Sequence, residues 1–213
     1  MLTVIGANAS PFVRKVRVFL AEKGVDYTLE PLFPFGPNPE FRKISPLGKI
    51  PVLRDGDKVV NDSSVICAYL ERTHPTPALY PTDPYEYSRA LWFEEYGDGG
   101  IAPVVGGKVF FPRVVGPRFM NRPADEAAIK KSLEEEIPPL FDYLESQLSG
   151  DYFVGNKLSV GDLGIATQFV NFRHAGEKVD AKRWPKLAGF VDRMHARPSF
   201  QAVIAEEEAQ FKS

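Results

Sequence analysis

The chain has 213 residues, 44% of them hydrophobic and 25% charged, which is ordinary for a soluble globular protein. The formal net charge of −2 argues against nucleic acid or an anionic membrane surface as the main partner. No apolar run approaches the roughly 20 residues of a membrane span. The N-terminus does not read as a signal peptide, and a single cysteine excludes an intramolecular disulfide. We expect a cytoplasmic protein of one large domain or two small ones.

The N-terminal residues predict a β-α-β unit. Residues 2–5 are apolar and partly β-branched, which favours a buried strand. Pro11 fits the first turn of a helix, the apolar residues after it follow helical spacing, and Gly24 supplies a C-terminal stop. Residues 25–32 predict a second strand. The connection through a helix indicates that the two strands run parallel.

A second set of elements follows. Residues 33–49 are rich in Pro and Gly and indicate irregular structure with one short helical turn. Residues 50–62 form two extended runs around an Asp-Gly-Asp turn, a β-hairpin pattern. Residues 62–74 begin with capping side chains and continue at helical spacing. The first module is therefore β-α-β, a loop, then β-β-α.

The rest of the chain is predicted to be helical. Residues 74–86 contain four prolines, a density that no helix or strand interior tolerates. We therefore predict a first domain at 1–76, a linker at 77–86 and an all-helical domain at 87–213. One apolar stripe covers residues 129–148, with a bend expected at its Pro-Pro pair, and another covers 187–194.

Two further segments of the helical domain are distinctive. Ser159 and Asp162 have the spacing of a capping box, and the nearly all-apolar helix after them is predicted to be the centre of this domain. Residues 99–123 are apolar but interrupted by Gly and Pro. They fit either a distorted helix pair or an ordered loop, and either could line a ligand cleft or simply cover the core.

Three positions of the first module combine polar groups with exposed backbone. Ser10 precedes a helix and fits an N-cap, but its hydroxyl could also contact a ligand atom. Pro51 opens a strand, where a missing N–H is tolerated, and a cis Ile50–Pro51 bond would turn the Ile50 backbone outward to pair with an extended peptide. Asp62 and Ser63 start the next helix, whose free N–H groups could hold a carboxylate.

Together these features resemble the glutathione transferase superfamily over essentially the whole chain. The resemblance implies a thioredoxin-like N-terminal domain (α/β, βαβ-ββα) followed by an all-α C-terminal domain. The segments that carry it are "SPFVRKVRVFLAEKGVDY", "SPLGKIPVL", "NDSSVICAYLE" and "LSVGDL".

The resemblance implies a glutathione site. Ile50 beside a cis Pro51 would pair with the cysteinyl unit, and Ser63 would hold the γ-glutamyl carboxylate. Asp62 would face the γ-glutamyl ammonium, although many relatives carry a longer residue there. Lys49 would face the glycine carboxylate, with Arg42 or Lys43 as substitutes.

Ser10 would donate a hydrogen bond to the glutathione sulfur. Lowering a thiol pKa from about 8.5 to about 6.5 requires roughly 2.7 kcal/mol. The N-terminus of a helix offers about 0.3–1 kcal/mol, whereas a hydrogen bond to a charged group offers about 1.5–3 kcal/mol. The hydroxyl therefore closes a gap that the helix dipole leaves open.

The other candidate residues have simpler interpretations. Cys67 is interpreted as a small core residue. The three histidines lack metal-ligand spacing, so no metal is expected. The Glu runs at 134–136 and 206–208 are interpreted as solvated helix surface. Three aromatic residues are either core or the lining of a second-substrate pocket: Phe12, Trp92 and Tyr96.

The function that the resemblance favours is conjugation of glutathione, as co-substrate, to a small hydrophobic electrophile by a serine-type enzyme. The same thiolate could instead drive isomerisation, dehalogenation or peroxide reduction. A binding or regulatory protein without turnover is a further alternative. Thiol–disulfide exchange is disfavoured, because a serine cannot form a mixed disulfide. The resemblance also implies a homodimer, and no nucleic acid or membrane partner is expected.

Overall fold

The structure is a computed structural model that describes residues 1–33 and 36–212. Contacts divide the chain into two compact units. The first comprises Met1–Tyr80 together with the helix that starts at Pro198, and the second comprises Pro81–Arg197. The predicted domain ranges placed residues 198–213 with the helical domain, whereas the contacts group this last helix with the first unit. The ranges themselves stay a prediction.

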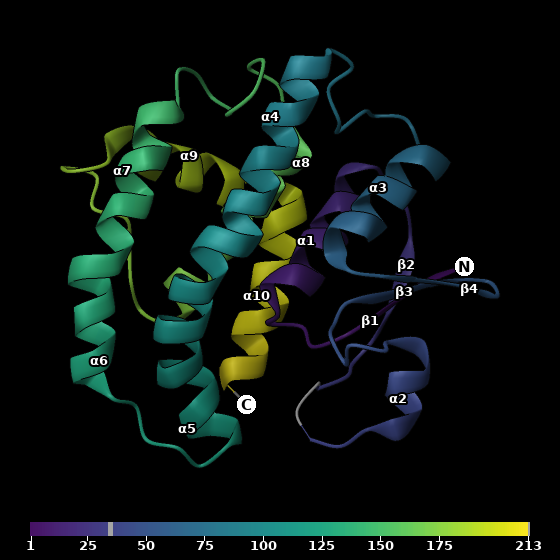
Figure 1. Cartoon of the computed structure of the whole chain (residues 1–213), viewed down its shortest axis with the longest axis horizontal. Coiled ribbons are helices and arrows are strands. Elements are labelled where there is room, and N and C mark those ends of the chain that lie inside the picture. Colours follow the sequence, from purple (N-terminus) through teal and green to yellow (C-terminus); the bar gives the residue numbers. More distant parts are fainter. Residues whose placement is uncertain (34–35, 213) are drawn as a thin grey trace. The chain divides into compact units, whose positions relative to one another are not determined.

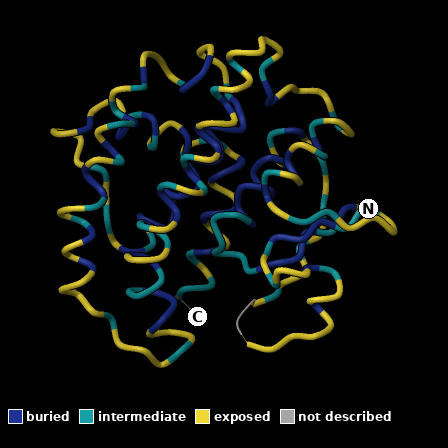
Figure 2. Tube along the Cα trace, in the orientation of Figure 1, coloured by how far each residue is buried: buried dark blue, intermediate teal, exposed yellow. Residues whose placement is uncertain are grey.

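The first unit has the predicted thioredoxin-like βαβ-ββα order (Figure 1). Its sheet has the order β2-β1-β3-β4, with β1 and β2 parallel, as predicted, and the other pairs antiparallel. The predicted hairpin is present, and its turn is exposed (Figure 2). Its elements are β1 (Leu2–Ile5), α1 (Pro11–Glu22), β2 (Tyr27–Glu30), α2 (Pro39–Ile44), β3 (Val52–Asp55), β4 (Lys58–Asn61), α3 (Ser63–Thr73) and α10 (Pro198–Lys212).

Helix α1 packs beside β1, α3 and α10. Pro11 occupies its first turn, where the missing N–H costs no helical hydrogen bond. Its residues from Val13 to Leu20 are all buried, including three basic ones. At its C-terminal end the buried Lys23 ammonium donates to the carbonyl oxygens of His74 and Pro77, each at 2.7 Å. Burial of its middle residues and the Lys23 hydrogen bonds at its C-terminal end therefore both stabilise α1.

The second unit is all-helical, as predicted. Most residues of α8 are buried, which confirms it as the centre of this unit. No helix among the described residues is both long and apolar enough to span a membrane. The elements are α4 (Pro84–Glu95), η1 (Tyr96–Val115), α5 (Gly116–Phe119), α6 (Glu126–Lys131), η2 (Ser132–Glu136), α7 (Ile137–Gln147), α8 (Val160–His174) and α9 (Pro185–His195).

Residues 99–123 fall mostly in a distorted helix rather than a loop. The backbone stays helical from α4 through η1 into α5, but η1 has the wide i→i+5 turns of a π-helix and contains Pro103 and Pro112. Gly97 explains one interruption. A Cβ atom there would lie 2.6 Å from the carbonyl oxygen of Gly164, so only glycine lets η1 approach α8 this closely.

The predicted capping box starts α8. The N–H and the hydroxyl of Ser159 both donate to Oδ2 of Asp162 at 2.8 Å, and the N–H of Phe153 donates to Oδ1 at 2.9 Å. Asp162 is completely buried. Its carboxyl group therefore joins the preceding loop to the first turn of the central helix.

Candidate functional site

The sheet register brings three of the predicted site segments to one end of the first unit. Ile5, the last residue of β1, pairs with Val52, which in turn pairs with Asn61 at the end of β4. The Ser10 loop follows Ile5, Ile50–Pro51 precedes Val52, and Asp62–Ser63 follows Asn61. Since neighbouring strands lie about 4.8 Å apart, the three segments occupy a strip roughly 10 Å wide.

Ser10 is the N-cap of α1, as predicted. Its Oγ accepts a hydrogen bond from the N–H of Val13 at 3.4 Å, longer than an ordinary hydrogen bond. The residue is only partly buried, and its hydroxyl hydrogen has no acceptor among the described residues. A hydroxyl has two lone pairs and one hydrogen. Capping therefore leaves its donor available.

Ile50 and Pro51 are joined by a cis peptide bond. Neither backbone polar group of Ile50 takes part in a hydrogen bond within residues 1–33 and 36–212. The loop after β1 lies against this residue, since a Cβ atom at Gly6 would come 3.2 Å from Cβ of Ile50. The Ile50 backbone can thus pair with an extended chain placed beside the Ser10 loop.

Asp62 and Ser63 form the start of α3. Asp62 is its N-cap and accepts the N–H groups of Ser64 and Val65 through Oδ1, at 2.9 and 3.3 Å. Its φ of 73° lies in the left-handed region, which non-glycine residues rarely adopt. Ser63 is buried, and within the described chain its hydroxyl makes no hydrogen bond. The Ser63 hydroxyl and Oδ2 of Asp62 are available to a ligand.

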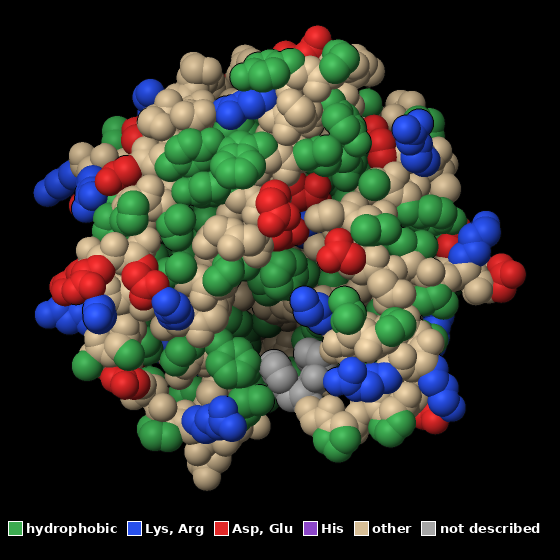
Figure 3. All heavy atoms as spheres, viewed as in Figure 1, with side chains coloured by type: hydrophobic (Ala, Val, Ile, Leu, Met, Phe, Trp, Pro, Cys, Tyr) green, Lys and Arg blue, Asp and Glu red, His purple; other side chains and the backbone are tan. Residues whose placement is uncertain are grey.

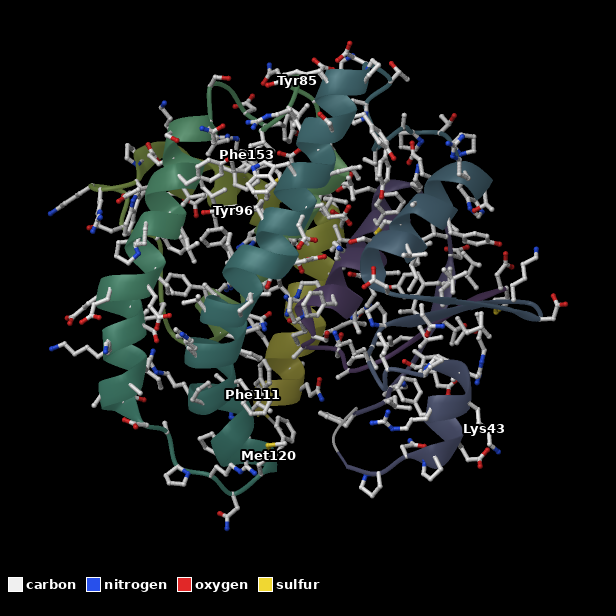
Figure 4. All side chains as sticks on the ribbon, in the orientation of Figure 1. Lys43, Tyr85, Tyr96, Phe111, Met120 and Phe153 are labelled. Atoms are coloured by element: carbon white, nitrogen blue, oxygen red, sulfur yellow. The ribbon has the colours of Figure 1, made fainter. Side chains whose placement is uncertain are left out.

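The three cations predicted near a glycine carboxylate differ in their partners. Arg42 donates to the carbonyl oxygen of Pro46 at 3.3 Å, and Lys43 lies exposed on α2 and pairs with Glu40 at 2.7 Å (Figure 4). Lys49 is exposed, and its ammonium has no ion pair or hydrogen bond in the described part of the chain. Of the three, Lys49 is the cation least committed elsewhere.

The residues predicted for the second-substrate pocket lie in different units. Phe12 is in the first turn of α1, next to the Ser10 loop. Trp92 and Tyr96 pack against Tyr143 of α7 in the second unit, and the Trp92 ring nitrogen donates to the Tyr143 hydroxyl at 2.6 Å. Hydrophobic side chains are gathered over α4 and α7 in Figure 3, and Figure 4 shows Tyr96 directed between these helices. Their assignment to the pocket stays a prediction.

The Tyr96 hydroxyl is not poised to ionise. It donates to the carbonyl oxygen of Leu140 at 3.2 Å. Burial, with a smaller contribution from Tyr143, raises the pKa of Tyr96 to about 12. Tyr96 therefore stays protonated near neutral pH.

A cavity of about 700 Å³ lies within the second unit, between α8, α9 and the segment that connects them. Apolar side chains such as Phe169 and Val191 share its lining with charged ones such as Lys178 and Asp192. None of the predicted site residues lines it.

Sequence reasoning missed a group of charges around the Ser10 loop. Arg14 and Arg17 on α1 are buried, and they pair with Glu207 and Glu206 of α10. The interpretation of residues 206–208 as solvated surface is wrong for Glu207, which is completely buried because α10 packs on α1 and Arg14 neutralises its charge. Basic residues at both i and i+3 of a buried helix were the signal that could have found this group.

Two further side-chain interpretations can be compared with the structure. Cys67 is a buried free cysteine in α3, which confirms it as a core residue. Among the described residues, His, Cys, Asp and Glu side chains form no group of three or more that could hold a metal ion.

Comparisons with known proteins agree with this geometry. Residues 4–78 match the family model of the glutathione S-transferase N-terminal domain, and residues 114–207 match that of the C-terminal domain. A glutathione S-transferase from Triticum aestivum is 30% identical over 209 residues, covering 95% of this chain and 92% of the relative. The maleylacetoacetate isomerase of Rattus norvegicus is 29% identical over 195 residues, covering 88% and 84%.

A solved structure gives the same result. The glutathione S-transferase from Methylobacterium radiotolerans, in complex with glutathione sulfonate, is 30% identical with a TM-score of 0.77, and the match covers 95% of this chain and 94% of that one. Both family models and the full-length relatives thus agree with the βαβ-ββα order and the all-helical second unit. The chain belongs to the glutathione S-transferase family.

Proposed function

We propose that this protein is a serine-type glutathione transferase that binds glutathione at the convergent end of the sheet and activates its thiol as a thiolate. Ser10 would donate to the sulfur, and the Ile50 backbone beside Pro51 would pair with the cysteinyl unit. Ser63 and Asp62 would hold the γ-glutamyl carboxylate and ammonium, and Lys49 the glycine carboxylate.

The size of the site supports this assignment. An extended tripeptide spans about 10 Å, which matches the roughly 10 Å strip across β1, β3 and β4. The strip offers a hydroxyl at the start of α3 beside the unpaired backbone of Ile50, and the exposed Lys49 directly precedes Ile50 in the chain. Helix N-termini favour carboxylates because their free N–H groups carry partial positive charge.

The observation that carries the proposal is the state of the Ser10 hydroxyl. It accepts only a long hydrogen bond from Val13 and keeps its own hydrogen free in the described chain. Capping and sulfur activation therefore use different parts of one group and do not compete. The long contact also leaves the hydroxyl free to rotate toward an incoming thiolate.

The reaction we propose is attack of this thiolate on a small hydrophobic electrophile. The sulfur lone pair forms a carbon–sulfur bond and the electrophile releases its leaving group or gains a proton. Phe12, Trp92 and Tyr96 are the residues proposed to contact the electrophile. We further propose that the protein acts as a homodimer in the cytoplasm, as family membership suggests.

A second candidate is a glutathione-dependent isomerase, which the similarity to maleylacetoacetate isomerase favours. In that reaction the thiolate would add to a carbon–carbon double bond and leave again after rotation, so that glutathione is regenerated. Product analysis separates the candidates. Conjugation consumes glutathione in proportion to product, whereas isomerisation leaves its concentration constant.

The test is the ultraviolet thiolate absorbance of bound glutathione as a function of pH, for wild type and Ser10→Ala. We expect a thiol pKa near 6.5 in wild type and at least about one unit higher in the variant, because a hydrogen bond to a charged group is lost. Circular dichroism of the two proteins controls for folding. Coincident titrations would reduce Ser10 to a cap. Binding without turnover of any electrophile would favour the binding-protein alternative.

A further inference from the structure

Two ion pairs connect α10 to α1 beside the loop that carries Ser10, and the two helices contact each other (Figure 1). In the first pair, Arg14 Nε donates to Oε1 of Glu207 at 2.8 Å and Nη2 donates to Oε2 at 2.6 Å. Both side chains are completely buried. Two parallel hydrogen bonds between planar groups fix the orientation of the guanidinium as well as its position.

The same guanidinium reaches the Ser10 loop. Nη2 of Arg14 also donates to the carbonyl oxygen of Ala9 at 3.3 Å. That oxygen belongs to the peptide group that joins Ala9 to Ser10, so the contact restrains the peptide plane from which the Ser10 side chain projects. An NH₂ group has two hydrogens. One can serve Glu207 while the other serves the loop.

The second ion pair holds the preceding residue of the loop. Arg17 donates to the side-chain oxygen of Asn8, to the Tyr27 hydroxyl at 2.7 Å and to Oε2 of Glu206 at 2.5 Å. Glu206 has 54% of its side chain exposed, so solvent weakens this pair relative to the buried one. The loop is thus held by two arginines, and each arginine is held by a glutamate of α10.

We propose that Glu207, with Glu206 in a lesser role, positions the Ser10 hydroxyl by fixing Arg14 and Arg17 against residues 8–10. Both glutamates act through the arginines and need not touch the substrate, so they are positioning residues. The consequence for the glutathione sulfur rests on the proposed function, since it requires that Ser10 donate to that sulfur. The ordering of residues 8–10 by the two glutamates does not depend on the proposed function.

The first test is Glu207→Gln. The glutamine NH₂ would face an arginine N–H, donor against donor, so the forked pair cannot form. Two readouts follow. The Ser10 N–H donates to the carbonyl oxygen of Ala7 at 3.1 Å, and its hydrogen exchange reports loop order in the ligand-free protein. We expect this exchange to become about tenfold faster and the thiol pKa of bound glutathione to rise by about one unit.

Ile204→Ala is the matched control, because it removes buried methyl groups from the same helix and leaves both partners of the Arg14–Glu207 ion pair in place. We expect Ile204→Ala to lower overall stability while leaving both Ser10 exchange and the thiol pKa near wild type. If Ile204→Ala shifts them as much as Glu207→Gln does, Glu207 has a general structural role and the proposal is overturned. Glu206→Gln should shift both readouts in the same direction by a smaller factor.

A double-mutant comparison separates positioning from charge burial. Arg14→Met and Glu207→Leu together replace the ion pair with apolar groups of similar length, a change that buried pairs often tolerate. If Glu207 acts through Arg14, adding Glu207→Leu to Arg14→Met causes no further loss in either readout, and any change is a recovery because the buried carboxylate is no longer unpaired. A further loss of similar size to that of Glu207→Leu alone would show that Glu207 acts independently of Arg14, contrary to the proposal.

The two readouts distinguish failure of the proposed function from failure of the positioning role. If wild type does not lower the thiol pKa, the thiolate assignment falls, while the exchange of the Ser10 N–H still decides whether Glu207 orders the loop. If wild type does form the thiolate and Glu207→Gln changes neither readout, the positioning role falls and the thiolate assignment stands. Faster exchange with an unchanged thiol pKa likewise overturns the link to the sulfur.

Discussion

At the residue scale, Ser63 offers a direct test of ligand orientation. Its hydroxyl is buried at the start of α3 and lacks a hydrogen-bond partner among the described residues. Ser63→Ala should raise the KM for glutathione about tenfold with little change in kcat, because a hydrogen bond to a charged group is worth about 1.5–3 kcal/mol. Steady-state kinetics at saturating electrophile measure both constants.

The control for Ser63→Ala is Thr73→Ala at the other end of the same helix, where the hydroxyl donates to the carbonyl oxygen of Tyr69. This control should leave both constants near wild type. Equal losses of kcat and kcat/KM in Ser63→Ala would contradict a role in ground-state binding, since they would show that the hydroxyl acts only in the transition state.

Glu207 shows which residues a sequence pattern cannot resolve. Three consecutive glutamates look equivalent in one dimension, but successive side chains on a helix diverge by about 100°. Glu206 is therefore half-exposed while Glu207 is buried on Arg14. The caps Ser10 and Asp62 were predictable, because capping positions have a local signature. A buried ion pair across 193 positions has none.

At the element scale, regular hydrophobic periodicity predicted the secondary structure correctly. Where the periodicity was irregular, the sequence left helix and loop both open. The strands and α1 follow from apolar patterns bounded by Gly and Pro. The helical run through η1 does not, because wide π-helical turns break the 3.6-residue period on which such patterns rest. Pro103 and Pro112 also indicated interruptions, yet the backbone passes through both.

The capping box of α8 makes a prediction about pH at this scale. Burial raises the pKa of Asp162 to about 6, although the N–H groups of Phe153 and Ser159 and the Ser159 hydroxyl lower it. The ordinary value is 3.8. The folded state thus binds the proton more tightly than the unfolded chain, so this contribution to stability falls as pH rises from about 4 to about 6.

The measurement is urea unfolding of wild type and Asp162→Asn at several values between pH 4 and 7. Two pKa units correspond to roughly 3 kcal/mol, so the stability of wild type relative to the variant should fall by up to about that amount across the window. Asparagine does not titrate, so the other acidic groups cancel in the difference. A difference that grows with pH would show that the three donors outweigh burial.

At the scale of the whole molecule, the last helix returns to the first unit. α10 follows the second unit in the chain but groups with residues 1–80 by contact. The predicted helical domain included residues 198–213 because they follow it directly in the chain. Contacts between distant segments depend on tertiary packing, and local pattern does not encode them.

The first unit should therefore depend on residues far from it in sequence. A chain that stops at Arg197 loses α10, including the buried side chains of Phe200, Val203 and Ile204. Each contributes about 1.5–3 kcal/mol, and Arg14 would lose the Glu207 carboxylate. Since domains are stable by only about 5–15 kcal/mol, we expect the first unit of this truncated chain to be largely unfolded at 25 °C.

Hydrogen exchange resolved along the chain measures whether the first unit of the truncated chain is folded. A protein that lacks only residues 212–213 is the control. Amides of β1 and α1 should lose protection in the long truncation and keep it in the short one. Retained protection in β1 and α1 without α10 would show that the sheet and α1 are stable alone. Glu207 could then affect the Ser10 loop only locally, through Arg14. Loss of protection would mean instead that folding of this unit requires the C-terminal helix, and with it the thiol activation that we propose.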